Sequence, residues 1–215
     1  MTAPGWGRPE AAIGAIAAVF IVALTPGLPI WASYLVLWAP LLAAVVLATY
    51  RYRPAEYAGC SIRFHITWMD VLVGAFVGLL LRSVIMIVEL LGVGYVTSSA
   101  SMFDVDHNLL WIATAIIAPV LLAPLVEELF FRGLVLPAIG KNWKGIAGSA
   151  IIFSGLHMVT GFHPLTAVST LIVGVTFGIL AVRTGRLGAS ITAHIVYNGS
   201  LIAMSELGGM AALSA

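Results

Sequence analysis

The chain has 215 residues, of which 61% are hydrophobic and only 9% are charged, with a formal net charge of +1 at pH 7. Soluble domains carry about 25% charged residues, so this composition excludes a protein whose whole surface faces water. The near-neutral charge and the lack of a basic cluster give no indication of nucleic-acid binding. A single cysteine, Cys60, excludes an internal disulfide framework. The composition predicts an all-α, polytopic membrane protein.

Runs of about 20 mostly apolar residues indicate helices that can span a bilayer. In chain order, such runs are expected at 9–25, 29–50, 69–94, 109–139, 145–161, 165–182 and 188–207. A retained first helix is favoured over a removed signal peptide, because only Arg8 provides positive charge before it and no clear cleavage site follows. Pro119 and Pro124 are expected to kink the long fourth run. We therefore predict a helical bundle of about seven spans, with eight as the alternative, in a single domain over residues 1–215.

Basic residues near the ends of these runs predict their orientation, because lysine and arginine are retained on the cytoplasmic side of membranes. They fall at alternate connections, namely Arg8, Arg51, Arg53, Arg63, Lys141, Lys144, Arg183 and Arg186. An opposite connection, 96–108, contains neither lysine nor arginine. The pattern predicts an integral protein of the cell membrane with a cytoplasmic N-terminus and an external C-terminus.

The expected spans contain few ionisable residues, namely Arg82, Glu89, Glu127, Glu128, Arg132, His157 and His194. Ionisable groups at membrane depth are costly, so they are candidates for function. At ~1.5 Å rise per residue, the ionisable residues of the fourth, fifth and seventh runs lie roughly 9–18 Å from the cytoplasmic ends of those runs, and so does Asn198. We expect them to share one partly hydrated cavity. Arg82 and Glu89 are expected to form a separate structural or cavity-lining pair, with contact between Arg82 and a substrate carboxylate as the alternative.

The spacing of these residues separates their expected roles. Glu128 and Arg132 lie four residues apart, so they share a helix face and are expected to form a structural ion pair. Glu127 points about 100° away around the axis, where a carboxylate without a cationic partner is suited to act as a general base. His194 and Asn198 also lie four residues apart and offer an imidazole and an amide to one cavity.

This set of groups is suited to hydrolysis of an amide bond without a covalent nucleophile. A carboxylate beside an imidazole can deprotonate water, while an amide and an imidazole N–H can stabilise the oxyanion of a tetrahedral intermediate. A serine nucleophile is less favoured, because Ser154 and Ser190 lie on no nucleophile-elbow pattern and serine in membrane helices usually serves packing. Phe153 is expected to pack on His157, and Gly155 between them is expected to let a neighbouring helix approach.

Three motifs on separate predicted helices resemble those of the CAAX protease and bacteriocin-processing family. They read EELFFRG with Glu127, Glu128 and Arg132, FSGLH with Phe153 and His157, and HIVYN with His194 and Asn198. The resemblance implies an intramembrane endopeptidase of the CAAX-processing type, built as a helical bundle whose cavity opens to the cytosol, with its catalytic core at about 109–207. It implies that Glu127 and His157 activate water and that His194 and Asn198 form the oxyanion hole.

Other functions remain open on the residues alone. No metal or other cofactor is expected, although Glu127, His157 and His194 form a His₂Glu set of the kind that binds zinc with an open position. Carboxylates and histidines at membrane depth are also typical of proton-coupled transporters. A non-catalytic membrane scaffold or immunity protein of the same family is a third alternative. The expected partners are a peptide or membrane-protein substrate and the lipid bilayer, without nucleic acid, and the oligomeric state is not indicated.

Overall fold

The computed structural model describes residues 7–25, 27–51, 62–92, 109–159 and 164–213. Within these ranges the chain is helical apart from short connections and one isolated bridge between Arg63 and Arg186. Cys60, the expected connection at 96–108 and the side chain of Glu89 lie outside the described residues, and so does the expected Arg82–Glu89 pair.

Within the described residues, each run predicted from the sequence contains a helix. The first three helices are α1 (Arg8–Leu24), α2 (Ile30–Arg51) and α3 (Trp68–Gly92). A continuous helical run follows, made of α4 (Leu109–Trp111), η3 (Ile112–Leu122), α5 (Ala123–Glu127), η4 (Glu128–Val135) and α6 (Leu136–Ile139). The last three are α7 (Trp143–His157), α8 (Pro164–Thr184) and α9 (Gly188–Leu213). The all-α prediction is confirmed.

The expected number of membrane spans is not confirmed. Among the described residues, four segments are long and apolar enough to cross a membrane, namely Trp31–Arg51, Trp68–Val88, Leu109–Ile139 and Pro164–Thr184. The helices α1 and α7, with 17 and 15 residues, are shorter than the ~20 residues that a span needs. Apolar runs also arise in helices that are buried by protein, so counting runs gives more spans than length and hydropathy together support. The apolar helices are those of an integral membrane protein.

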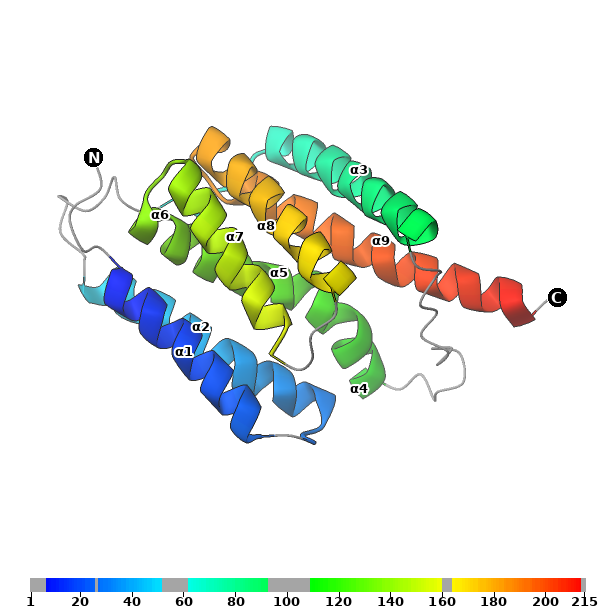
Figure 1. Cartoon of the computed structure of the whole chain (residues 1–215), viewed down its shortest axis with the longest axis horizontal. Helices are drawn as coiled ribbons and strands as arrows, with labels where there is room; N and C mark the ends of the chain where they lie inside the picture. The colour runs from blue at the N-terminus through cyan, green and yellow to red at the C-terminus, as the bar shows by residue number, and fades with distance from the viewer. Residues whose placement is uncertain (1–6, 26, 52–61, 93–108, 160–163, 214–215) are drawn as a thin grey trace.

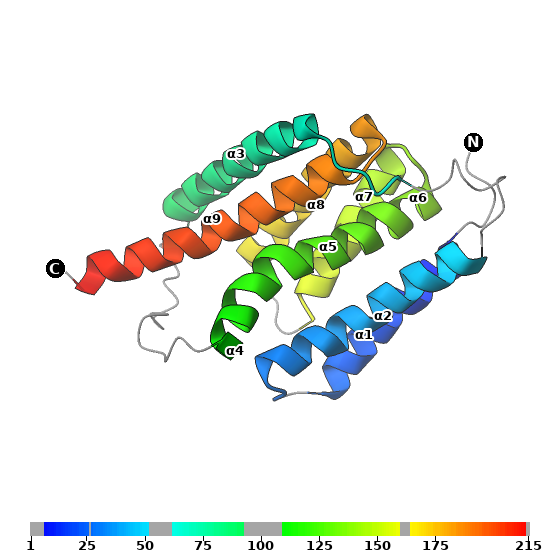
Figure 2. The same cartoon turned by 180° about the vertical axis from the view of Figure 1, so that it is seen from behind.

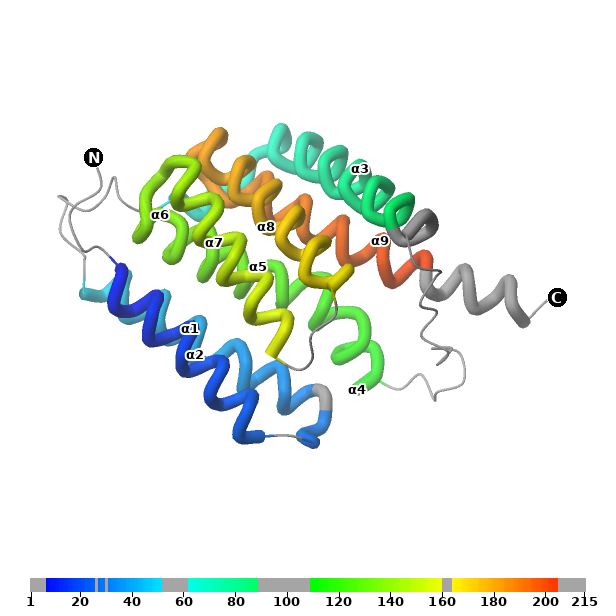
Figure 3. Tube along the Cα trace, in the orientation of Figure 1, coloured from blue at the N-terminus to red at the C-terminus, as the bar shows by residue number. Residues whose placement is uncertain are grey.

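The helices form neighbouring layers around the run 109–139 (Figures 1 and 2). The α1–α2 hairpin packs along one side of this run, while α7 packs on α8, α8 on α9, and α3 lies outermost against α9. The trace in Figure 3 follows the same path and places the α1–α2 hairpin and α3 on opposite sides of the molecule. The layers bring α5, η4, α7 and α9, which carry the three motifs, into the middle of the bundle.

Charged side chains join helix ends at one end of the bundle. The Arg8 Nε donates to a carbonyl of α6 at 3.0 Å, and Arg51 of α2 pairs with Glu10 of α1 at 3.1 Å. Between α8 and α9, Arg186 pairs with Asp70 of α3 at 2.7 Å. These basic residues were expected on one side of the membrane, and they lie at the end of the bundle where α1, α3, α7 and α9 begin (Figure 1).

The outermost helix, α3, contacts α9 through glycines. A Cβ atom on Gly78 would lie 2.5 Å from the backbone oxygen of Ala193, and one on Gly74 would lie 2.6 Å from that of Ala189. Glycines four residues apart let two membrane helices approach with backbones nearly in contact. The α3–α9 interface therefore depends on the missing side chains at both positions.

We expect Gly78→Ala to lower the free energy of unfolding by about 1–3 kcal/mol, because the new methyl group must push α3 away from α9. Gly155→Ala is the matched control, since no other described residue lies within 4 Å of its Cβ position. Alanine favours a helix over glycine by about 0.5–1 kcal/mol, so the control is expected to be at least as stable as wild type. Denaturant titration of the purified proteins in detergent measures both changes, and equal stabilities would contradict the interface.

Candidate active site

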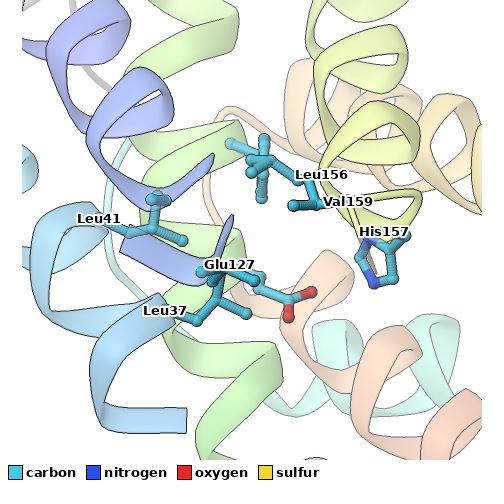
Figure 4. Close-up of a pocket in the computed structure, with 9 residues that line it drawn as sticks. Leu37, Leu41, Glu127, Leu156, His157 and Val159 are labelled. Atoms are coloured by element: carbon cyan, nitrogen blue, oxygen red, sulfur yellow. The ribbon is translucent and has the colours of Figure 1, made fainter. Parts of the chain in front are cut away.

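A cavity of about 210 Å³ lies between the α1–α2 hairpin and the helices that carry the motifs. Glu127 and His157 are the polar side chains that line it. The remaining lining residues are apolar, namely Ala18, Val22, Leu37, Leu41, Phe131, Leu156 and Val159. The Glu127 carboxylate points toward the His157 imidazole across one side of this cavity (Figure 4). An acid and an imidazole are thus presented together to an apolar space.

Glu127 is the last residue of α5, at the junction with the π-helical segment η4. Its side chain is nearly buried, with 8% of the residue exposed, and its Oε2 has no hydrogen-bond partner among the described residues. The Nε2 of His194 lies 3.8 Å from this oxygen, which is beyond hydrogen-bond distance. A buried oxygen without a partner indicates a place for water or a ligand, and π-helical segments frequently occur at functional sites.

Glu128 is the centre of a buried network. Its Oε1 accepts a hydrogen bond from Arg132 Nη1 at 2.9 Å and lies 3.0 Å from His194 Nδ1. The guanidinium also donates through Nη2 to the Gly174 carbonyl of α8 at 3.1 Å, and its Cζ lies 4.7 Å from the centre of the Phe153 ring. The ion pair expected from the spacing is therefore present, and it additionally connects η4 with α8 and α9.

The hydrogen bond to Glu128 orients the imidazole of His194. An ionised carboxylate only accepts hydrogen bonds, so His194 Nδ1 carries a proton and Nε2 is the nitrogen nearer Glu127. Glu128 and His194 are 66 residues apart in the chain, and sequence spacing gave no signal for their contact.

His157 is the last residue of α7 and is exposed at the cavity. Its Nδ1 lies 2.9 Å from the Phe153 carbonyl, which only accepts, so Nδ1 donates and Nε2 of the neutral ring keeps a free lone pair. The two rings pack with centroids 4.4 Å apart, as the sequence predicted. The expectation that Gly155 admits a neighbouring helix is wrong, because the described residues leave the space beside it empty.

Asn198 contacts the helical run through the backbone of η3. Its Nδ2 donates to the Pro119 carbonyl at 2.8 Å. In a regular run this carbonyl would receive an N–H from four or five residues later, but the Ala123 N–H donates to Ala118 and Pro124 has no N–H. The π-helical register and Pro124 together leave this carbonyl without a backbone donor, and Asn198 supplies one. The run also bends between α4 and α5 (Figure 2), as expected for a proline-containing helix.

The structure brings together some of the predicted site residues and not others. Glu127 and His157 line one cavity and His194 lies beside Glu127, whereas Asn198 is not among the lining residues. No group of three or more histidine, cysteine, aspartate or glutamate side chains in the described part of the chain is placed to hold a metal ion. The alternative ligand set of Glu127, His157 and His194 is therefore not gathered as a three-ligand site.

Sequence reasoning missed the α1–α2 hairpin as part of the site. Ala18 and Val22 of α1 and Leu37 and Leu41 of α2 form one wall of the cavity. These residues look like ordinary apolar helix residues, so no local signal marked them. Pro124 indicates that a carbonyl of the preceding turn lacks its N–H donor, but the π-helical register that makes this the Pro119 carbonyl has no signal in the sequence.

One comparison with known proteins gives a match. A family model described as Rce1-like, type II CAAX prenyl endopeptidase, matches residues 109–200. No curated protein and no solved structure matches the chain. The matched segment includes all three motifs and leaves out α1, α2 and α3. The resemblance predicted from the motifs is confirmed over this segment.

Proposed function

Because a model of the Rce1-like family, type II CAAX prenyl endopeptidases, matches residues 109–200, we propose that this protein is an intramembrane endopeptidase with Glu127 as the general base. The observation that carries the proposal is the buried Glu127 carboxylate, which lines a cavity together with His157 and whose Oε2 has no hydrogen-bond partner in the described residues. A carboxylate in this position can accept a proton from a water molecule that the imidazole also holds.

The proposed reaction is hydrolysis of a peptide bond. In this reaction a water molecule is held between the Glu127 carboxylate and Nε2 of His157, and its proton passes to Glu127 as its oxygen attacks the carbonyl carbon. The C=O electron pair moves onto oxygen and forms a tetrahedral oxyanion. When this intermediate collapses, the C–N bond breaks and Glu127 returns the proton to the departing amine, which leaves a carboxylic acid and an amine as products. No metal or other cofactor takes part in this proposal.

His194 and Asn198 are proposed to stabilise the oxyanion. His194 is held by Glu128 at Nδ1 and directs its Nε2 toward the side of the cavity where Glu127 lies, where an N–H at that nitrogen can donate to the oxyanion. The Asn198 amide has two N–H groups, and its bond to Pro119 uses one of them, so the second is available for substrate. Donors held in place before the reaction need no reorganisation when negative charge develops.

Replacement of Asn198 separates a catalytic from a purely structural role. Asn198→Ala is expected to lower kcat by about 10²–10³-fold, as loss of one oxyanion-hole donor does, and to lower stability by about 1–3 kcal/mol because the Pro119 carbonyl loses its donor. Steady-state cleavage kinetics and denaturant unfolding of the same preparation measure both effects. Reduced stability with unchanged kcat would limit Asn198 to its contact with Pro119.

The end of the bundle where α1 begins is proposed to lie on the cytoplasmic side of a cell membrane. The basic ends of the helices support this orientation, because Arg8, Arg51 and Arg186 all lie at one end of the bundle and such residues are retained on the cytoplasmic side.

The function is tested with purified protein in proteoliposomes and a mixture of apolar peptides. Wild type is expected to generate new peptide N-termini that mass spectrometry identifies, and Glu127→Gln is expected to generate almost none. If neither protein cleaves the peptides, the proposal is overturned in favour of a non-catalytic scaffold. If both cleave them equally well, another mechanism must operate.

A further inference from the structure

We propose that the apolar part of the cavity is a subsite for one aliphatic or aromatic side chain of the substrate, and that the α1–α2 hairpin determines which side chain fits. The inference rests on the proposed function, because the subsite would hold the residue next to the bond that Glu127 attacks. The hairpin supplies Ala18 and Val22 from α1 and Leu37 and Leu41 from α2.

The lining defines the chemistry of the occupant. Beyond Glu127 and His157, the residues that line the cavity offer no side chain that forms strong hydrogen bonds. Ala18 is fully buried and Leu41 is 1% exposed, so this part of the wall is packed in place. A group that enters this space leaves contact with water or lipid headgroups and gains only apolar contacts, which favours hydrocarbon side chains.

The position of the two polar groups fixes which part of a peptide enters. A carbonyl attacked by water from Glu127 must lie beside that carboxylate and His157. The apolar space adjoins the same two side chains, so it receives a substituent only a few bonds from the reacting carbon. The side chain of a residue that flanks the cleaved bond meets this condition.

The volume sets the size of that side chain. An apolar cavity of about 150 Å³ binds benzene, with six carbon atoms, which corresponds to about 25 Å³ per carbon. The cavity of about 210 Å³ then accommodates about eight carbon atoms on that scale. Leucine, methionine and phenylalanine side chains fit within this volume, whereas a farnesyl chain of about fifteen carbon atoms would extend beyond it on the same scale.

The hairpin lies outside the segment that matches the protease family. The match covers residues 109–200, while α1 and α2 end before it. The acid, the imidazoles and the amide therefore belong to one segment, and the opposing wall of the subsite belongs to another. Changes in the hairpin can alter side-chain preference and leave Glu127 and His157 in place.

The test uses purified protein in proteoliposomes and a peptide mixture with randomised apolar residues, so that both positions flanking each cut are scored. Wild type is expected to cut next to leucine, methionine or phenylalanine. Leu37→Ala enlarges the subsite and is expected to shift preference toward tryptophan by about tenfold or more, whereas Val22→Phe fills it and shifts preference toward alanine by a similar factor.

Two matched controls carry substitutions of the same kind on the same helices outside the cavity. Leu35→Ala changes a leucine that is 61% exposed, and Ile16→Phe changes an isoleucine that is 57% exposed, and neither residue lines the cavity. Both controls are expected to cut with the wild-type preference. If a control changed the side-chain preference as much as the corresponding cavity variant does, the assignment of the subsite would be wrong.

The remaining outcomes separate this inference from the proposed function. If wild type cuts and Glu127→Gln does not, while Leu37→Ala and Val22→Phe keep the wild-type preference, the subsite is wrong and the endopeptidase stands. If wild type and Glu127→Gln give the same result, the proposed function fails and the subsite with it. A peptide with a farnesylated cysteine serves as a further probe. If its cleavage rate depends both on the length of the isoprenoid and on Leu37, the cavity binds a lipid and the proposal is overturned.

Discussion

Cleavage by the Glu127→Gln variant is expected to be about 10²–10⁴-fold slower than by wild type, the range that a general base contributes. Glutamine keeps the shape of the side chain and its place at the end of α5, but its amide cannot accept the proton of the attacking water. The rate is measured as the appearance of new peptide N-termini in proteoliposomes under single-turnover conditions, so that product release does not limit it.

Glu10→Gln is the matched control for this substitution. Glu10 is also nearly buried, with 6% of the residue exposed, and pairs with Arg51 at the charged end of the bundle, away from the residues that line the cavity. Its replacement removes a buried carboxylate elsewhere and is expected to leave the cleavage rate within about twofold of wild type, because it leaves the proton acceptor intact. Wild-type cleavage by Glu127→Gln itself would exclude Glu127 as the base.

The second large effect concerns stability. Arg132→Met is expected to lower the free energy of unfolding by about 3–5 kcal/mol, because it leaves the Glu128 carboxylate buried without its cation. Both side chains of this pair are fully buried, so water cannot replace the lost partner. Denaturant titration in detergent, followed by tryptophan fluorescence, measures the change.

The double variant Glu128→Gln/Arg132→Met provides the internal comparison. It removes both charges, so it is expected to be more stable than Arg132→Met alone, even though His194 also loses its carboxylate partner. Lys144→Met is the control for loss of a positive charge, since Lys144 is exposed at the start of α7, and it is expected to change stability by less than about 0.5 kcal/mol. If Arg132→Met were as stable as this control, the buried pair would have no role in holding the fold.

Local features of the site could be predicted from the sequence. The Glu128–Arg132 pair follows from a spacing of four residues on one helix, and the packing of Phe153 on His157 follows from the same rule. The helices themselves follow from apolar runs long enough to be recognised without knowledge of their neighbours. Each of these features depends on a few consecutive turns of one helix.

Contacts between distant helices could not be predicted in the same way. The bond from Glu128 to His194 and the bond from Asn198 to Pro119 depend on how α9 is set against the run 109–139. Nothing in the local spacing fixes that relative position. The π-helical geometry of η3 and η4 adds to the difficulty, because it changes which residues share a face compared with the α-helix that we assumed.

The hairpin wall had no signal in the sequence, and the number of spans is not confirmed, for a related reason. Leu37 and Leu41 line the cavity and Leu35 faces outward, yet all three are leucines on one apolar helix. In a membrane protein both the core and the lipid-facing surface are apolar, so hydrophobic periodicity loses the contrast that separates inside from outside in a soluble helix.

The local nature of the Glu128–Arg132 pair has a consequence for biosynthesis. During translation the run 109–139 enters the bilayer before α8 and α9 have been made, and a charged residue at the centre of an inserting helix costs about 2.5–3.5 kcal/mol. Because Arg132 and Glu128 are four residues apart on one helix, they can neutralise each other while this segment is still alone in lipid. The Gly174 carbonyl and His194 are synthesised later. The two charges can therefore pair within the nascent chain before their other hydrogen-bond partners have been made.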